Sequence, residues 1–165
     1  MTSIPPTVHL LCGLNGVGKT TLARELEASL PAVRFSLDEW MLRLYPGLHY
    51  ASEDYGSRAE TCKGLIWETA LQVLRAGTDV VLDWNQWSRA RRALWRGKAV
   101  SAGFGVELHH VATPLDTAIE QTRRRTLAAE PGSHALTDDG VRHLAGIFEE
   151  PSETEGMRIH RVPGR

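Results

Sequence analysis

The sequence has few cysteines, no long apolar run and no excess of charge of one sign. Its 165 residues include only Cys12 and Cys62 as cysteines, too few for a disulfide framework. Lysine and arginine total 19 and aspartate and glutamate total 20, so the net charge is −1. This balance excludes a globally basic surface that wraps nucleic acid. No apolar stretch approaches the roughly 18 to 20 residues that a membrane span needs.

The N-terminal segment Met1 to His9 lacks the basic start and the apolar core of a signal peptide. We therefore expect both cysteines to be reduced thiols, and the protein to be cytoplasmic without a membrane partner. A length of 165 residues with 42% apolar residues predicts a single domain over 1–165 that buries its own core. The oligomeric state, monomer or homodimer, stays open.

Apolar runs typical of strands alternate with helical patterns along the chain. Strands are expected at 7–12, 33–37, 79–83, 106–111 and 157–162, and helices at 19–30, 40–44, 53–75, 88–101, 114–127 and 137–148. The polar, breaker-rich segment 128–134 predicts a loop. This alternation favours right-handed crossovers and a parallel sheet covered on both faces, which is an α/β fold.

The segment 13–20 reads GLNGVGKT and matches the phosphate-binding pattern G-x-x-x-x-G-K-[ST]. Its glycines let successive backbone N–H groups point at one anion, and the helix that follows adds its positive end. Lys19 is expected to reach the outer phosphates and Thr20 to hold Mg²⁺. No guanine-reading N-K-x-D segment is present, so we expect ATP. The predicted nucleotide-binding residues are Gly13, Leu14, Asn15, Gly16, Val17, Gly18, Lys19, Thr20 and Thr21.

Two aspartates stand at the carboxyl ends of expected strands, where an open parallel sheet binds its ligands. Asp38 could accept the proton of an attacking hydroxyl or bind a metal through water; it could also simply cap a helix. Asp83 follows an apolar strand in the position of a carboxylate near Mg²⁺, or is a turn residue. The predicted metal-binding residues are Thr20, Asp83 and Asp38.

Arg123, Arg124 and Arg125 lie late in the helix after the fourth strand, within an expected lid over about 123–136. Three consecutive helical positions spread over about 200°, so at most two of them face one site. An arginine there could close over a transferring phosphoryl group. The alternative is a solvated cationic helix end.

Several segments together resemble the small P-loop kinases, an AAA-type group that includes chloramphenicol phosphotransferase, zeta-toxin-like kinases and the kinase domain of polynucleotide kinases. The resemblance rests on GLNGVGKTTLARELEASL, FSLDEW, VVLDWNQWSRARR, VATPLD, RRRT and PSETEG. It implies a three-layer P-loop NTPase fold, with a five-stranded parallel sheet in the order 2-3-1-4-5 and a short lid. It also implies that Asp38 is the base. These kinases often carry two lid arginines four residues apart; here the positions hold Gln121 and Arg125, which favours Arg125.

The acceptor is less well defined by the sequence. Exposed tryptophans at 40, 84 and 87 could stack on a flat or sugar-like acceptor, or could instead pack helices on the sheet. Other acceptor candidates are Tyr50, Glu53, Asp54 and Tyr55. Neighbouring strand residues face opposite sides, so His109 and His110 cannot both bind one ion and are expected to pack structurally.

Taken together, the sequence predicts an ATP- and Mg²⁺-dependent kinase that phosphorylates a hydroxyl of a small molecule such as an antibiotic, a nucleoside or a sugar. The expected catalytic residues are Asp38, Lys19, Arg125 and Arg123. A 5′-hydroxyl polynucleotide kinase is the first alternative, although the near-neutral charge counts against nucleic acid as the acceptor. An ATP-sensing binding module and a zeta-type toxin kinase are further alternatives.

Overall fold

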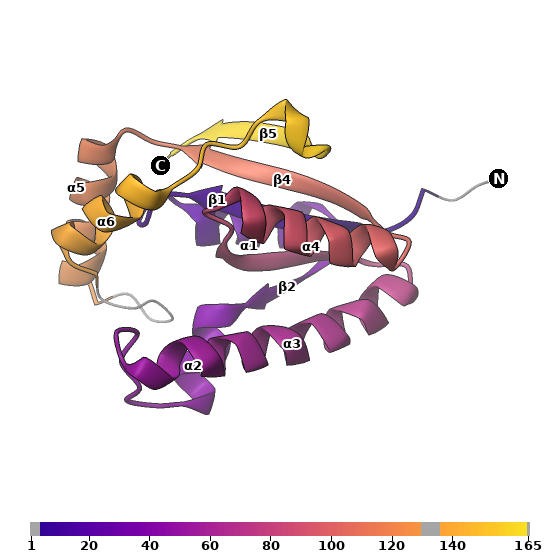
Figure 1. Cartoon of the computed structure of the whole chain (residues 1–165), viewed down its shortest axis with the longest axis horizontal. Coiled ribbons are helices and arrows are strands. Elements are labelled where there is room, and N and C mark those ends of the chain that lie inside the picture. Colours follow the sequence, from indigo (N-terminus) through magenta and orange to yellow (C-terminus); the bar gives the residue numbers. More distant parts are fainter. Residues whose placement is uncertain (1–3, 130–135, 165) are drawn as a thin grey trace.

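Five strands form one parallel sheet in the order β2-β3-β1-β4-β5, in a computed structural model that describes residues 4–129 and 136–164 (Figure 1). The predicted α/β class, parallel sheet and strand order are therefore confirmed. The strand that leads into the glycine-rich loop lies at the centre. The strands are β1 (Thr7–Gly13), β2 (Ala32–Ser36), β3 (Asp79–Asn85), β4 (Gly105–Ala112) and β5 (Arg158–Pro163).

Six α-helices lie within the described residues, close to their expected ranges. Ser88 and Thr137 cap the helices that follow them, as predicted, each accepting a hydrogen bond from a backbone N–H in the first turn. Pro114 stands just before its helix and not inside the first turn. The helices are α1 (Lys19–Ser29), α2 (Leu37–Leu44), α3 (Glu53–Arg75), α4 (Arg89–Ser101), α5 (Leu115–Leu127) and α6 (Asp138–Ile147).

The sequence analysis missed a short 3₁₀ helix, η1 (Glu153–Glu155), which has a Ser152–Glu155 capping box. It is a single turn, too short for a periodic pattern to reveal. Of the loop expected at 128–134, and of the lid expected at 123–136, the residues 130–135 lie outside the described part of the chain.

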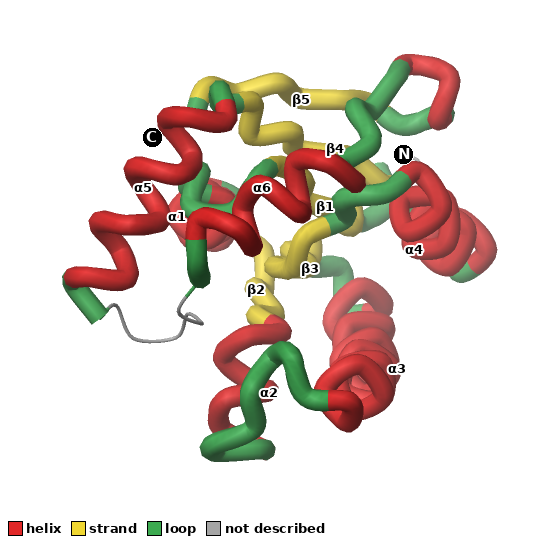
Figure 2. Tube along the Cα trace, turned by 60° about the vertical axis from the view of Figure 1, so that its left-hand side comes forward, coloured by secondary structure: helices red, strands yellow, loops and turns green. Residues whose placement is uncertain are grey.

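Helices cover both faces of the sheet (Figure 2). Successive residues of β1 face opposite sides of the sheet. Leu10 packs in the larger apolar cluster with residues of α3 and α4, whereas Leu11 packs with Ala23 of α1. A third cluster joins Val111 of β4 to α5 and α6. Both cysteines are buried free thiols, as expected. None of the described helices combines the length and the apolar character that crossing a membrane requires.

Candidate functional site

The glycine-rich loop between β1 and α1 is held against α5. Gly16 has a φ of +74° and Gly18 one of +98°, which L-residues with side chains rarely adopt. A Cβ on Gly16 would lie 2.3 Å from Thr122 Oγ1 and 3.0 Å from its backbone nitrogen. The Thr122 hydroxyl donates to Asn15 O at 3.3 Å. Thr122 therefore belongs to the site; its distance along the chain concealed this contact from sequence reasoning.

Lys19 bends back over this loop. Its ammonium donates to Gly13 O at 3.2 Å and to Leu14 O. Desolvation lowers the pKa of Lys19 to about 8, and the positive charge of Arg125 acts in the same direction. An anion bound in the loop would act in the opposite direction on this pKa, because a negative charge favours the charged form of lysine.

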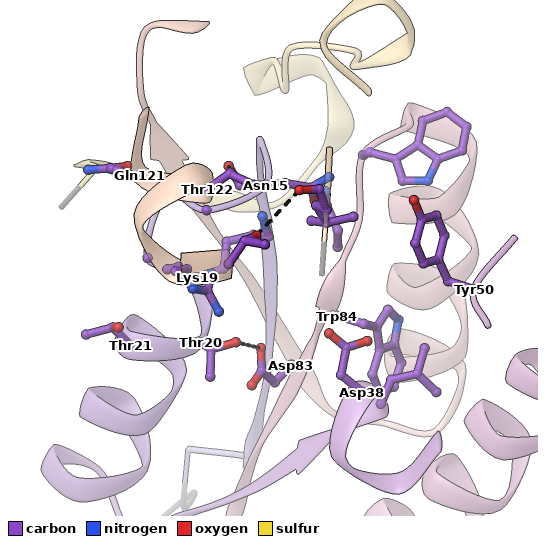
Figure 3. Close-up of a pocket in the computed structure, with 18 of the residues that line it drawn as sticks. Asn15, Lys19, Thr20, Thr21, Asp38, Tyr50, Asp83, Trp84, Gln121 and Thr122 are labelled. Atoms are coloured by element: carbon purple, nitrogen blue, oxygen red, sulfur yellow. Dashed lines mark hydrogen bonds between the residues drawn. The ribbon is translucent and has the colours of Figure 1, made fainter. Parts of the chain in front are cut away.

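Thr20 and Asp83 meet at the carboxyl edge of the sheet, as expected. The Thr20 hydroxyl donates to Asp83 Oδ1 at 3.4 Å (Figure 3). A hydroxyl oxygen and a carboxylate oxygen next to a phosphate loop are the hard ligands that Mg²⁺ prefers. Burial raises the pKa of Asp83, while the neighbouring Arg34 guanidinium acts in the opposite direction.

Arg34 is a second residue that the sequence analysis missed. From β2 its Nη1 donates to Asp83 Oδ2 at 2.8 Å, and its Nη2 donates to Glu39 Oε1 at 2.7 Å. The Arg34 side chain is largely buried. Arg34 is a charged residue inside a short apolar strand, four residues before Asp38. Such a residue is rarely buried without a partner, so the sequence could have predicted an ion pair here.

Asp38 lies in the first turn of α2, whose N-cap is Ser36. Its carboxylate faces the cavity next to Trp84, on the side away from the phosphate loop (Figure 3). The structure thus brings Asp38, Asp83, Thr20 and Lys19 to one cavity.

Asn85 fixes the start of the phosphate loop from the neighbouring strand. Its amide donates from Nδ2 to Gly13 O at 2.8 Å. The next residue, Gln86, donates its backbone N–H to Leu11 O at 2.9 Å. The segment 83–85 therefore positions the loop through Asn85 and presents a carboxylate through Asp83.

Of the three consecutive arginines, the structure brings two to the cavity. Arg124 and Arg125 line it together with Gln121, and Arg124 is paired with Glu120 at 2.9 Å. Arg123 is exposed and forms an ion pair with Asp138 of α6. Arg123 does not line the cavity, because the helical rotation directs its side chain toward α6.

Some of the acceptor candidates line the cavity and others do not. Trp84, Trp87 and Tyr50 line the cavity, and Trp84 is at the same time a core residue that packs edge-to-face on Trp95. Trp40 is partly buried and packs against Phe35. The expected group Glu53, Asp54 and Tyr55 does not line the cavity: Asp54 pairs with Arg58, and Tyr55 packs on the core.

The cavity has a volume of about 890 Å³, within the range for small-molecule and cofactor sites. The phosphate loop, α2, the end of β3 and α5 supply its walls. Three buried polar atoms among its lining residues, Trp84 Nε1, Asn85 Oδ1 and Gln121 Oε1, have no hydrogen-bond partner within the described part of the chain. Such atoms are suited to contact a ligand.

The fold and this site together define a P-loop protein with a kinase-like fold. A family model described as "AAA domain" matches residues 8–151, and the chain belongs to that family. The resemblance to small P-loop kinases is confirmed by both the family and the solved structures of similar fold. No curated protein matches the sequence significantly.

Three solved structures illustrate the fold. A candidate kinase from Chloroflexus aurantiacus J-10-fl has a TM-score of 0.75 at 18% identity, with 97% of this chain and 86% of that chain covered. Kti12 of Chaetomium thermophilum, in complex with ADP-AlF3, has a TM-score of 0.73 at 19% identity over 94% and 88%. The APS kinase CysC of Mycobacterium tuberculosis, in complex with AMPPNP and APS, has a TM-score of 0.65 at 20% identity over 98% and 90%. At these identities the likeness concerns the fold.

Proposed function

We propose that this protein is an ATP- and Mg²⁺-dependent kinase that transfers the γ-phosphoryl group to a hydroxyl of a small molecule. The observation that carries the proposal is one cavity lined by Lys19, Thr20, Asp38, Asp83 and Arg125. A phosphate loop alone would serve nucleotide binding. A carboxylate on the far side of the same cavity is what an attacking hydroxyl needs in addition.

The phosphate loop, with Lys19, binds the ATP phosphates. Thr20 and Asp83 would hold Mg²⁺, which would neutralise charge on the phosphates. The nucleotide complexes of two similar folds, with ADP-AlF3 and with AMPPNP, support a nucleotide in this loop. Asn85 and Thr122 keep the loop in the shape that presents its N–H groups.

The acceptor's hydroxyl oxygen attacks the γ-phosphorus, and Asp38 receives the proton of that hydroxyl. The new oxygen–phosphorus bond forms while the bond to the β,γ-bridging oxygen breaks, and ADP leaves with that electron pair. Arg125, at the end of α5, neutralises charge that develops on the transferred group. Arg124 shares this wall of the cavity.

The acceptor lies between Asp38 and the aromatic side chains of Trp84, Trp87 and Tyr50. Flat aromatic faces with a few polar atoms favour a sugar, nucleoside or aromatic antibiotic over a long polyanion. The net charge of −1 also counts against a polynucleotide acceptor.

The decisive experiment is transfer from γ-labelled ATP to pools of antibiotics, nucleosides, sugars and 5′-hydroxyl oligonucleotides. Wild-type protein is compared with Asp38→Asn, which should keep ATP binding and lose about a hundredfold or more in turnover. Asp54→Asn is the matched control, because this exposed aspartate lies outside the cavity.

Transfer to one small-molecule pool that disappears in Asp38→Asn supports the proposal and identifies the acceptor class. Preferred transfer to oligonucleotides, with binding that falls steeply as salt rises, would instead favour the polynucleotide kinase. Tight ATP binding without transfer to any pool would favour an ATP-sensing module.

A further inference from the structure

A cluster of histidines and carboxylates lies outside the cavity, nearer the amino ends of the strands. It is built by four adjacent strands: Asp79 starts β3, His9 is on β1, Glu107 and His109 are on β4, and His160 is on β5. The sheet register pairs His9 with Glu107 and His109 with His160. Paired residues share a face, so these side chains converge on one side of the sheet.

The central contact joins two imidazoles. His9 Nδ1 and His109 Nε2 are 3.0 Å apart. Two nitrogen ligands of a tetrahedral zinc ion, each about 2.0–2.1 Å from the metal, lie about 3.3 Å apart. Ligand atoms of His9, His109 and Glu107 all lie within 4.8 Å of one another. Small side-chain shifts therefore suffice to place the three around one ion.

The surroundings already orient these groups. Asp79 Oδ2 lies 3.2 Å from His9 Nε2, and Asp79 Oδ1 accepts the Thr7 N–H at 2.8 Å. With its Nε2 proton directed at Asp79, His9 presents a lone pair at Nδ1. On the other side, Glu107 Oε2 lies 2.7 Å from His160 Nε2. A carboxylate behind a ligating histidine is the recurring outer arrangement of protein metal sites.

We propose that His9 Nδ1, His109 Nε2 and the Glu107 carboxylate bind a zinc ion, with water in the fourth position. Asp79 and His160 act as positioning residues. Imidazole nitrogens suit zinc and related transition metals, whereas Mg²⁺ prefers all-oxygen sites. This site is thus chemically distinct from the one expected at Thr20 and Asp83.

Burial and access both suit an ion. His9 and His109 are buried, and the Glu107 and His160 side chains are 29% and 31% exposed, so an ion can approach from the Glu107 side. Bound zinc would join β1 to β4 and so brace the strand that carries the phosphate loop.

The test uses the tag-free full chain, freed of metal by a chelator. Excess Mg²⁺ is present throughout, so that cobalt does not occupy the phosphate-loop site. Cobalt(II) is titrated as the spectroscopic probe, and zinc is then added. We expect a single cobalt ion with the visible absorption of a four-coordinate site, displaced by zinc. Zinc at about a hundredfold excess over its Kd should raise the Tm by about 5–10 °C.

Variants assign the ligands. Glu107→Gln and His109→Gln should abolish the cobalt spectrum, and Asp79→Asn should weaken binding about 10- to 100-fold. His110→Gln is the matched control: it is the next residue of β4, equally buried, and it stacks with Phe148 on the opposite face. Circular dichroism identifies any variant that fails to fold. Glu107→Gln is the conservative variant, because the Glu107 side chain is partly exposed. A wild-type protein without the cobalt spectrum, or equal affinity in Glu107→Gln and His110→Gln, would overturn the assignment.

Discussion

The guanidinium of Arg34 donates to the Asp83 carboxylate at 2.8 Å and so joins β2 to the carboxyl end of β3. Both side chains are largely buried, at 11% and 5% exposure. Removing one partner of such a pair strands a charge in the interior, which destabilises more than the pair itself stabilises. Arg34 therefore favours the ionised form of Asp83 and opposes the effect of burial on this carboxyl.

From this relationship we expect Arg34→Met to lower the free energy of unfolding by about 3–5 kcal/mol at pH 7. Urea denaturation measures the change. Arg24→Met is the control, because Arg24 is exposed and lies 3.6 Å from the same Glu39; a surface pair contributes below about 1 kcal/mol. The double variant Arg34→Met with Asp83→Asn should lose less than the sum of the single losses. Additive losses would show that the pair is not coupled.

A second prediction concerns Gly16, the loop glycine that packs against α5. Alanine at Gly16 meets the Thr122 backbone and also strains a φ of +74°. Strain of about 1–3 kcal/mol is expected, which would weaken ATP binding by about ten- to a hundredfold. Gly47→Ala is the control for a strained glycine outside the cavity: its φ is +82°, and no atom lies within 4 Å of the added Cβ. Calorimetric titration with ATP should find Gly47→Ala close to wild type, and a Gly16→Ala protein with unchanged affinity would contradict the packing argument.

The arginines of α5 differ in where they point. Arg125 lines the cavity, whereas Arg123 is paired with Asp138. We expect Arg125→Gln to reduce kcat by about a hundredfold or more, since it removes charge stabilisation in the transition state. Arg123→Gln should have a much smaller effect. Steady-state kinetics on the acceptor found by the screen decides between them; the reverse order would return Arg123 to the catalytic role that the sequence suggested.

A pH-dependent prediction concerns the buried pair Arg92 and Glu155. Arg92 Nε and Nη2 donate to the two Glu155 oxygens at 2.7 and 2.9 Å. Burial alone raises the pKa of Glu155, but the hydrogen bonds from Arg92 and Ser152 and the charge of Arg92 outweigh it, so the pKa is lowered. A depressed pKa means that the stability this carboxylate contributes is present above its unfolded value near 4.5 and is lost as the pH falls through the folded value.

Accordingly, Glu155→Gln should destabilise by about 3–5 kcal/mol at pH 7, and the difference from wild type should shrink in acid. Urea denaturation at neutral and acidic pH measures both. Glu153→Gln is the control on the same 3₁₀ turn, where an exposed pair with Arg161 contributes below about 1 kcal/mol. A loss that stayed constant down to pH 3 would argue that packing, and not charge, stabilises this contact.

The local sequence was sufficient to predict most of the helices and strands and the position of the phosphate loop. The loop GLNGVGKT predicted its own strand–turn–helix setting, because glycine conformations and helix starts depend on near neighbours. The alternation of apolar runs predicted the parallel sheet, and the likeness to P-loop kinases implied its strand order. Asp38 and Asp83 reached the cavity because strand ends in such a sheet share one edge.

What the sequence by itself determined, then, is the order of elements and which residue types stand at the carboxyl edge. Only the tertiary structure decided that Thr122 packs on Gly16, that Arg34 pairs with Asp83, that Arg125 faces inward while Arg123 does not, and that His9 meets His109. These contacts join residues far apart along the chain or depend on the rotation of a helix. They are set by how the elements pack, which no local pattern of residues encodes.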